Sequence, residues 1–256
     1  MKQHLDAVQS SFDPRAQAYL SSAVHAAGAD LQAARELLAA PGQRIERALD
    51  LGCGAGHLAY VLAPQVGQVV AFDASPAMLD VVRDCAAQRG LGNLDCQVGD
   101  VHQLPFADSS FDLVATRYSA HHWRDLPRAM AEARRVLRSG GRLLFIDLEA
   151  PSDTLVDTHL QAMELLRDPS HVRNRSREEW LALLRAIGAQ VEHEQRWPTR
   201  LQFDTWVQRM QTPEPMVRAI RLLQQGAPAE VSAGLAIEPD GSFTPSTVLW
   251  WARCAG

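Results

Sequence analysis

The sequence predicts an α/β fold in which helices connect the strands of a mostly parallel sheet. From about residue 47, short apolar runs alternate with segments whose apolar residues have helical spacing. This alternation is typical of β-α-β units. Hydrophobic residues make up 46% of the 256 residues, enough for a large core. The length suits one α/β domain with insertions.

The apolar runs that we interpret as strands are residues 47–51, 68–73, 94–98, 111–116, 142–148, 189–197 and 247–253. Helices are expected from about 57, over 76–88, from 126, over 153–168 and 177–188, and over 203–210 and 214–225. Start signals are Ser75-Pro76, Asp125-Leu126-Pro127 and a capping box from Ser176 to Glu179. Gly140-Gly141 is expected to end the helix that starts at 126. Trp250 and Trp251 should point to opposite faces of the last strand, at least one of them into the core.

Composition and charge exclude several functional classes. No run approaches 18 uncharged apolar residues and the N-terminus lacks a secretory signal, so we expect a cytoplasmic protein without a membrane partner. The net charge is −5 and the densest basic run, 173–177, holds three arginines, which argues against nucleic acid. The four cysteines form no CxxC pair, so zinc and disulfide interpretations lose support.

A glycine-rich turn follows the first predicted strand. Glycine tolerates positive φ and lets a ligand approach the backbone closely, and such a turn points N–H groups into the crevice at the strand ends. The spacing here is GxGxG, at Gly52, Gly54 and Gly56, whereas dinucleotide sites typically have GxGxxG, with the third glycine where this chain has His57. Alone, the turn also fits a purely structural role.

Two carboxylates follow the next two predicted strands. Asp73 ends the second strand, 21 residues after Gly52, where Rossmann-like sites bind a ribose diol. Asp100 follows the third strand, where its carboxylate can accept from an adenine amine and the Val101 N–H can donate to a ring nitrogen. Each aspartate alone also fits a cap or a turn. The glycine-rich turn, Asp73 and Asp100 follow three consecutive predicted strands, and together they favour an adenosyl ligand.

Five segments together resemble the class I S-adenosylmethionine-dependent methyltransferases, over roughly residues 48–148. They are LDLGCGAGHL, VVAFDASPAML, GDVHQLPF, FDLVATRYSAHHW and EARRVLRSGGRLL. More narrowly, the chain is similar to the type 11 group, which includes quinone-biosynthesis methyltransferases and uncharacterised bacterial relatives. The resemblance implies a Rossmann-like, mostly parallel seven-stranded sheet with an antiparallel final strand and helices on both faces. It also implies one methyltransferase domain over 1–256, with cofactor-covering helices in 1–45, a cofactor-binding core in 46–150, and a lid with the C-terminal strands in 151–256.

The resemblance further implies which residues bind S-adenosyl-L-methionine. The methionine and ribose parts would lie against Asp50, Gly52, Gly54 and Gly56, the ribose hydroxyls on Asp73 beside Ala74, the adenine on Asp100 and Val101, and the sulfonium beside Arg117. A fainter similarity of the N-terminal segment would place Tyr19 near the methionine end.

His121 and His122 are the candidate catalytic residues. They follow the fourth strand, near the expected methyl group, and histidine titrates close to neutral pH. We therefore expect one of them to orient or deprotonate the acceptor. In the alternative interpretation, one caps the helix at Asp125 and the other packs under Trp123.

His171 and Arg173 are candidate substrate-binding residues on the predicted lid, where an arginine can pair with an acceptor carboxylate. A solvated loop with an ion pair is the alternative. Asp147 and Glu149 share one face at the end of the fifth strand, but no further carboxylate or asparagine accompanies them at ligand spacing, so we expect no metal.

The predicted function is methyl transfer to O, N or C of a small acceptor by in-line displacement. Aromatic residues after 153 fit a planar or hydrophobic acceptor and equally fit a core. One alternative is a protein that binds S-adenosylmethionine or S-adenosylhomocysteine for regulation, without methyl transfer. A nicotinamide-dependent dehydrogenase is disfavoured by His57 in place of the third glycine. We expect a monomer or a homodimer.

Overall fold

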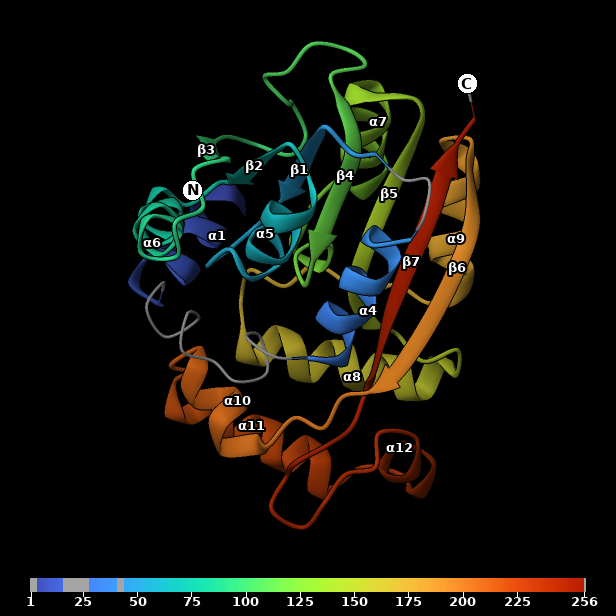
Figure 1. Cartoon of the computed structure of the whole chain (residues 1–256). Helices are drawn as coiled ribbons and strands as arrows, with labels where there is room; N and C mark the ends of the chain where they lie inside the picture. Colours follow the sequence, from blue (N-terminus) through green and yellow to red (C-terminus); the bar gives the residue numbers. More distant parts are fainter. Residues whose placement is uncertain (1–3, 16–27, 41–43, 256) are drawn as a thin grey trace.

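One seven-stranded sheet organises the structure. The computed structural model describes residues 4–15, 28–40 and 44–255, and the strand order in this part is β3-β2-β1-β4-β5-β7-β6 (Figure 1). Each predicted strand is present, and the predicted α/β fold is confirmed. The strands are β1 (Arg47–Leu51), β2 (Gln68–Asp73), β3 (Leu94–Val98), β4 (Phe111–Arg117), β5 (Leu137–Glu149), β6 (Ala189–Pro198) and β7 (Ser246–Cys254).

The strand order creates a crevice beside β1. This central strand pairs in parallel with β2 on one side and with β4 on the other. The chain therefore leaves the β1–β2–β3 half of the sheet and returns on the other side at β4, and such a switch opens a ligand site at the carboxyl ends of the strands. β7 pairs antiparallel with both β5 and β6, so the predicted antiparallel final strand is confirmed.

Helices cover both faces of the sheet and the carboxyl ends of its parallel strands (Figure 1). Their predicted start signals are confirmed: Ser75 and Asp125 each accept a hydrogen bond from the N–H three residues on, and Ser176 with Glu179 forms a capping box. The helices are α1 (His4–Phe12), α4 (Ala29–Leu38), α5 (His57–Leu62), α6 (Pro76–Gln88), α7 (Leu126–Val136), α8 (Thr154–Arg167), α9 (Arg177–Ala186), α10 (Phe203–Arg209), α11 (Glu214–Gln225) and α12 (Ala229–Gly234), with short 3₁₀ turns η1 (Asp13–Arg15), η2 (Ala63–Gln65) and η3 (Ala120–His122).

The two faces of the sheet pack into separate cores. Trp251 contributes to the core under α4, α5 and α6, and Trp250 to the core under α7 and α9. Their exposed fractions are 2% and 1%, so the predicted opposite orientation is confirmed and both side chains are core residues.

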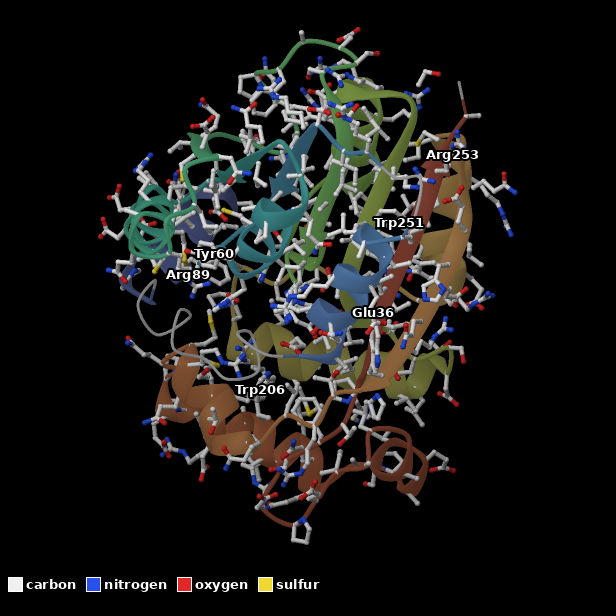
Figure 2. The ribbon with its side chains drawn as sticks, viewed as in Figure 1. Glu36, Tyr60, Arg89, Trp206, Trp251 and Arg253 are labelled. Carbon is white, nitrogen blue, oxygen red and sulfur yellow. The ribbon has the colours of Figure 1, made fainter. Side chains whose placement is uncertain are left out.

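A third apolar cluster holds α8, α10, α11 and α12 together. These helices form a layer below the carboxyl end of β4 (Figure 1). Trp206 lies within this layer, whereas Trp251 lies along the sheet (Figure 2). α12 was not predicted from the sequence. Of the helices in the described part of the chain, none combines the length and the apolar character that crossing a membrane requires.

The predicted end of α7 is wrong. The helix ends at Val136, and β5 begins at the next residue, so Gly140 and Gly141 lie inside the strand. The glycines occupy an irregular part of the β4–β5 pairing, where the register shifts between Phe111 and Leu113, and Gly140 has a φ of +72°. Glycines after a helical pattern fit a bulge as well as a helix end.

Candidate active site

The glycine loop forms one wall of a cavity at the carboxyl end of β1. Gly52, Gly54 and Gly56 have φ values of +63°, +50° and +83°, which favour glycine. An added Cβ at Gly56 would lie 2.8 Å from the Tyr60 ring, whereas one at Gly54 would meet nothing within 4 Å. The loop therefore packs on α5 at Gly56 and exposes its backbone to the cavity at Gly54.

Asp73 ties this loop to β2. Its Oδ2 accepts from the backbone N–H of Gly54 at 2.8 Å, and its Oδ1 accepts from that of Ser75 at 2.9 Å. Burial raises the pKa of Asp73 although these N–H groups lower it. Each carboxylate oxygen has two lone pairs, so Asp73 can still accept from a ligand hydroxyl.

Asp100 is held by a histidine that sequence reasoning did not single out. Its Oδ1 accepts from the backbone N–H of His102 at 2.9 Å and lies 2.5 Å from the Nδ1 of the same residue. The Nε2 of His102 accepts from the Asp125 N–H at 3.1 Å, so Nδ1 carries the proton. Burial acts to raise the pKa of Asp100, but the contacts with His102 outweigh it and the pKa is lowered.

The N-terminal helix α1 closes the cavity. His4 Nε2 donates to the His122 carbonyl at 2.9 Å, and Gln9 donates to the Ala74 carbonyl at 2.8 Å. Predicted Tyr19 lies outside the described residues. The other predicted cofactor residues except Gly56 line the cavity, and the lining is His4, Leu5, Val8, Phe12, Asp50, Gly52, Cys53, Gly54, Ala55, His57, Leu58, Asp73, Ala74, Met78, Gly99, Asp100, Val101, His102, Arg117, Tyr118, Ser119, His122, Trp123 and Arg124.

Two buried charges border this cavity in different ways. Arg117, at the end of β4, forms a buried ion pair with Asp30 of α4, and their side chains are 4% and 5% exposed. Asp50 is fully buried, and neither carboxylate oxygen has a hydrogen-bond partner among the described residues. Burial raises the pKa of Asp50 to about 7, while the Ala59 backbone and Arg117 act in the opposite direction.

His121 is oriented by the next strand. Its Nδ1 lies 2.6 Å from Oδ1 of Asp147 on β5, and its backbone N–H donates to Oδ2 at 3.2 Å. Burial acts to lower the pKa of His121, but the Asp147 carboxylate outweighs it and the pKa is raised. With the Nδ1 proton held by Asp147, Nε2 presents a lone pair, and within the described structure it has no hydrogen-bond partner.

His122 is held differently. Its Nδ1 donates to the Ser170 carbonyl at 3.1 Å. Burial and the adjacent His121 lower the pKa of His122 to about 4, so its ring is neutral near pH 7. The predicted alternative in which a histidine caps α7 is wrong, because Asp125 itself is the cap.

A second cavity adjoins the first and shares Phe12, Tyr118 and His122 with it. Its space, open mouth included, is about 550 Å³. Side chains of α8 and α10 line it, and a lid role for this region stays a prediction. The remaining lining residues are His121, Leu148, Glu164, Arg167, Thr199, Leu201, Trp206 and Arg209.

Comparisons with known proteins identify the family. A model of the methyltransferase domain matches residues 49–145. The chain is 43% identical to the uncharacterised protein YafE of Escherichia coli, over 77% of this chain and 96% of that protein, and 37% identical to the uncharacterised methyltransferase YcgJ of Bacillus subtilis, over 80% of each. The chain belongs to this methyltransferase family. Its cofactor is S-adenosylmethionine, as the sequence predicted.

Two further findings place the methyltransferase among its relatives. The crystal structure of YcgJ superposes with a TM-score of 0.82 at 33% identity, covering 89% of this chain and 98% of that one. This confirms the Rossmann-like fold. A 2-phytyl-1,4-naphtoquinone methyltransferase of Synechococcus elongatus is 37% identical over 59% of this chain and 67% of its own length.

The residues of the first cavity fit S-adenosylmethionine. The ligand carries an ammonium group, and Asp50 offers two buried carboxylate oxygens that lack partners in the described structure. The open space at Gly54 allows close approach to the backbone. Asp73 and Asp100, at the ends of β2 and β3, supply further acceptors for hydroxyl and amine groups.

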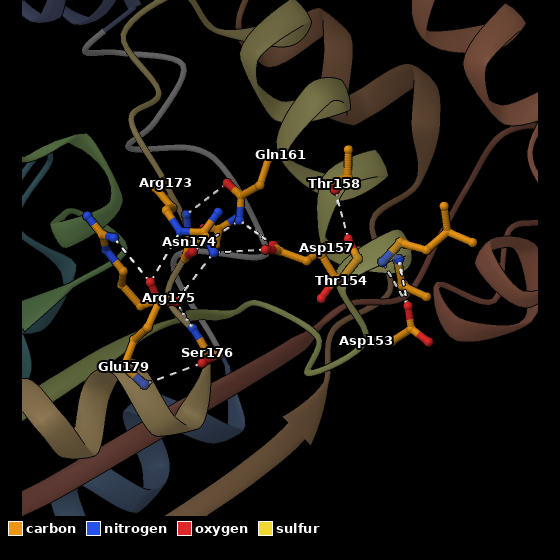
Figure 3. Close-up of polar contacts among 12 residues, drawn as sticks. Asp153, Thr154, Asp157, Thr158, Gln161, Arg173, Asn174, Arg175, Ser176 and Glu179 are labelled. Atoms are coloured by element: carbon orange, nitrogen blue, oxygen red, sulfur yellow. Dashed lines mark hydrogen bonds and ion pairs between the residues drawn. The ribbon is translucent and has the colours of Figure 1, made fainter.

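His171 and Arg173 lie outside the linings of the two cavities. Arg173 belongs to a polar network between α8 and α9 (Figure 3). His171 Nε2 lies 2.8 Å from the Gln161 side-chain oxygen, and burial lowers the pKa of His171 to about 2. Arg173 contacts Asp157 at 2.8 Å and Glu179 at 3.3 Å. This geometry favours the ion-pair alternative, and a role for either residue in substrate binding stays a prediction.

Two residues near the second cavity escaped sequence reasoning. Asp147 was weighed only as a metal ligand together with Glu149, but it binds His121, and Glu149 pairs with Arg196 at 2.6 Å. No group of three or more histidine, cysteine or acidic side chains suited to a metal occurs among the residues described. Glu164 lies beside the apolar face that Val156, Leu160 and Met163 form on α8, and no local pattern in the sequence marks it.

Proposed function

We propose that the chain transfers the methyl group of S-adenosylmethionine to O, N or C of a small planar or hydrophobic acceptor, which binds in the second cavity. The observation that supports this most is the shared wall of Phe12, Tyr118 and His122, because ligands in the two cavities would then lie side by side. The name of the Synechococcus relative contains a planar, hydrophobic naphthoquinone, which agrees with the aromatic lining at Trp206.

In the first cavity we assign the predicted residues to parts of the cofactor. Asp50 would bind the ammonium group and the backbone at Gly54 would contact the methionine and ribose parts. Asp73 would hold the ribose hydroxyls, and Asp100 with Val101 would bind adenine. The buried ion pair with Asp30 fixes the guanidinium of Arg117 beside this cavity, where we expect the sulfonium.

His121 is the proposed general base. S-adenosylmethionine supplies a methyl group on a positively charged sulfur, and the sulfur keeps the electron pair of the broken bond. The acceptor proton passes to Nε2 of His121, whose lone pair faces away from Asp147. Asp147 orients the ring through Nδ1 and stabilises the imidazolium that forms. Positioning supplies much of the remaining acceleration.

Formation of S-adenosylhomocysteine with a panel of phenols, amines and enols tests this proposal. His121→Gln should lower the single-turnover rate by about 10²–10⁴-fold, whereas the matched control His193→Gln, on the exposed face of β6, should not. A loss below tenfold for His121→Gln would show that proximity alone suffices. If no acceptor in the panel is methylated, the proposed activity is wrong for these classes.

The pH profile separates the base from a merely structural histidine. His121 must be neutral to accept a proton, so the rate should rise with pH through its raised pKa, above the usual value of about 6.5. Asp147→Asn removes the charge that raises this pKa, so the acid limb should move to lower pH while the plateau rate falls. An unchanged limb in Asp147→Asn would contradict the assignment.

A further inference from the structure

Glu164 is a buried carboxylate whose hydrogen bonding is incomplete. The residue is 4% exposed and lies on the inner face of α8, where it lines the second cavity. Its Oε2 lies 3.5 Å from Nη1 of Arg167, but its Oε1 has no hydrogen-bond partner within the described part of the chain. Burial raises the pKa of Glu164, and Arg167 and His121 act to lower it.

Glu164 lies on a mixed face of α8. Buried Leu160 precedes it by about one turn, and polar Gln161 and Arg167 lie three residues to either side of it. A buried polar atom without a partner typically costs about 1–3 kcal/mol. Such an atom on the wall of a cavity calls for a ligand that supplies the missing donor.

Arg167 does not supply that donor, because other contacts fix it. Its Nε donates to the Trp206 carbonyl at 3.0 Å, and its guanidinium lies over the Trp206 ring, 5.0 Å from the centroid. The arginine therefore stays at the Oε2 side of Glu164, and Oε1 is the atom left for a ligand.

His121 presents a second unpartnered acceptor atom on the same cavity wall. Its Nε2 lone pair can accept from a ligand, and Oε1 of Glu164 lacks a donor in the described residues. The two side chains are close enough for the charge of each to affect the pKa of the other. A ligand that satisfies both must carry two donor groups. Trp206 and Tyr118 add aromatic rings to the lining of this cavity.

We propose that Glu164 determines acceptor specificity by binding a second O–H or N–H group, so that the acceptor is a small planar molecule with two hydrogen-bond donors. This inference rests on the proposed function, in which the first donor group loses its proton to His121. The second group keeps its proton and binds Oε1 of Glu164. A site built to bind such a group strongly disfavours an analogue without it, because the carboxylate is then left without its partner.

Binding to the protein loaded with S-adenosylhomocysteine tests the inference without relying on methyl transfer. The probes are benzenediols, naphthalenediols and aminophenols, each paired with the monomethyl ether or N,N-dimethyl analogue that lacks one donor. In the native protein we expect the two-donor member of at least one pair to bind at least tenfold more tightly by calorimetry.

Glu164→Gln should reverse this preference. The guanidinium of Arg167 would hold the amide oxygen at the Oε2 position, so the NH₂ group would point into the cavity as a donor. The variant should then bind the ether at least as tightly as the diol. Glu164→Leu should bind both equally, and its melting temperature shows that the fold is intact. Glu238→Gln, an exposed substitution at an ion pair with Arg200, is the matched control and should behave as the native protein.

The inference is wrong if no two-donor probe binds, if the members of every pair bind equally to the native protein, or if Glu164→Gln leaves the preference unchanged. Parallel measurement of S-adenosylhomocysteine release keeps the two proposals apart. A preference that depends on Glu164 without methyl transfer would overturn only the proposed function. Methylation of one-donor acceptors at the same rate by native protein and Glu164→Gln would overturn only the inference.

Discussion

Replacing Asp50 with asparagine should stabilise the ligand-free protein while weakening cofactor binding. Asp50 lies near the end of its strand, fully buried, with two carboxylate oxygens that lack partners in the described residues. Asparagine has nearly the same shape and cannot ionise. The substitution therefore removes the cost of a buried charge and keeps the packing.

The magnitude follows from the pKa. A shift from 3.8 to about 7 corresponds to about 4 kcal/mol, at 1.36 kcal/mol per unit. Because the pKa is higher in the folded state, the folded protein binds the proton more tightly, and stability falls as pH rises from 3.8 toward 7. Asp50→Asn should thus gain about 2 kcal/mol at pH 5 and about 4 kcal/mol at pH 8.

Thermal unfolding at pH 5 and pH 8 measures this difference. About 4 kcal/mol corresponds to a rise in melting temperature of roughly 10 °C for a chain of this size. Calorimetry with S-adenosylmethionine should show at least tenfold weaker binding to Asp50→Asn, and affinity for the native protein that increases with pH near 7. Asp108→Asn, whose side chain is 77% exposed, is the control. A destabilised Asp50→Asn, or a gain independent of pH, would refute the reasoning.

Three further predictions concern the walls of the first cavity. Gly54→Ala and Gly56→Ala both put a side chain at positive φ, which costs stability, but an added Cβ meets nothing within 4 Å at Gly54 and lies 2.8 Å from the Tyr60 ring at Gly56. Gly54→Ala should therefore lower the melting temperature less than Gly56→Ala, while still weakening cofactor binding at least tenfold. Equal losses of melting temperature would contradict this. Asp30→Asn removes the carboxylate from the buried ion pair of Arg117 and should cost about 3–5 kcal/mol in chemical denaturation, whereas Asp30→Leu with Arg117→Leu should cost less. His102→Phe should weaken adenosine binding, because it removes the imidazole that holds the Asp100 carboxylate. The melting temperature of the ligand-free protein should change by no more than a few degrees. Unchanged adenosine affinity would show that this histidine does not position Asp100.

The strands could be predicted because their signals are local. An apolar run of five to seven residues, bounded by a turn or a helix cap, places a strand such as β1 or β2 without knowledge of its neighbours. The end of α7 was predicted wrongly because local signals do not determine it. Whether Gly140 ends a helix or bends a strand depends on the pairing with β4, which no local pattern contains.

The cofactor cavity was predictable because parallel strands bring their carboxyl ends together. Asp50, Asp73 and Asp100 each lie at the end of one strand or just beyond it, so a correct sheet order places all three beside one crevice. The chemical detail was not predictable. The proton on Nδ1 of His102 depends on the Asp125 N–H, which lies 23 residues further along the chain.

The second cavity depends on contacts between elements that the sequence keeps apart. Asp147 reaches His121 because β4 and β5 are neighbours, and that adjacency alone changes the interpretation of Asp147 from a candidate metal ligand to the partner of a histidine. Glu164 comes from a helix outside the sheet, and its incomplete hydrogen bonding is apparent only in the folded structure, where Arg167 contacts one carboxylate oxygen and not the other. In the proposed function, the methyl donor is recognised by residues at strand ends, whereas the acceptor is recognised by residues whose roles arise from tertiary packing. For this reason the sequence identifies the cofactor, and the specificity for the acceptor has to be inferred from the structure.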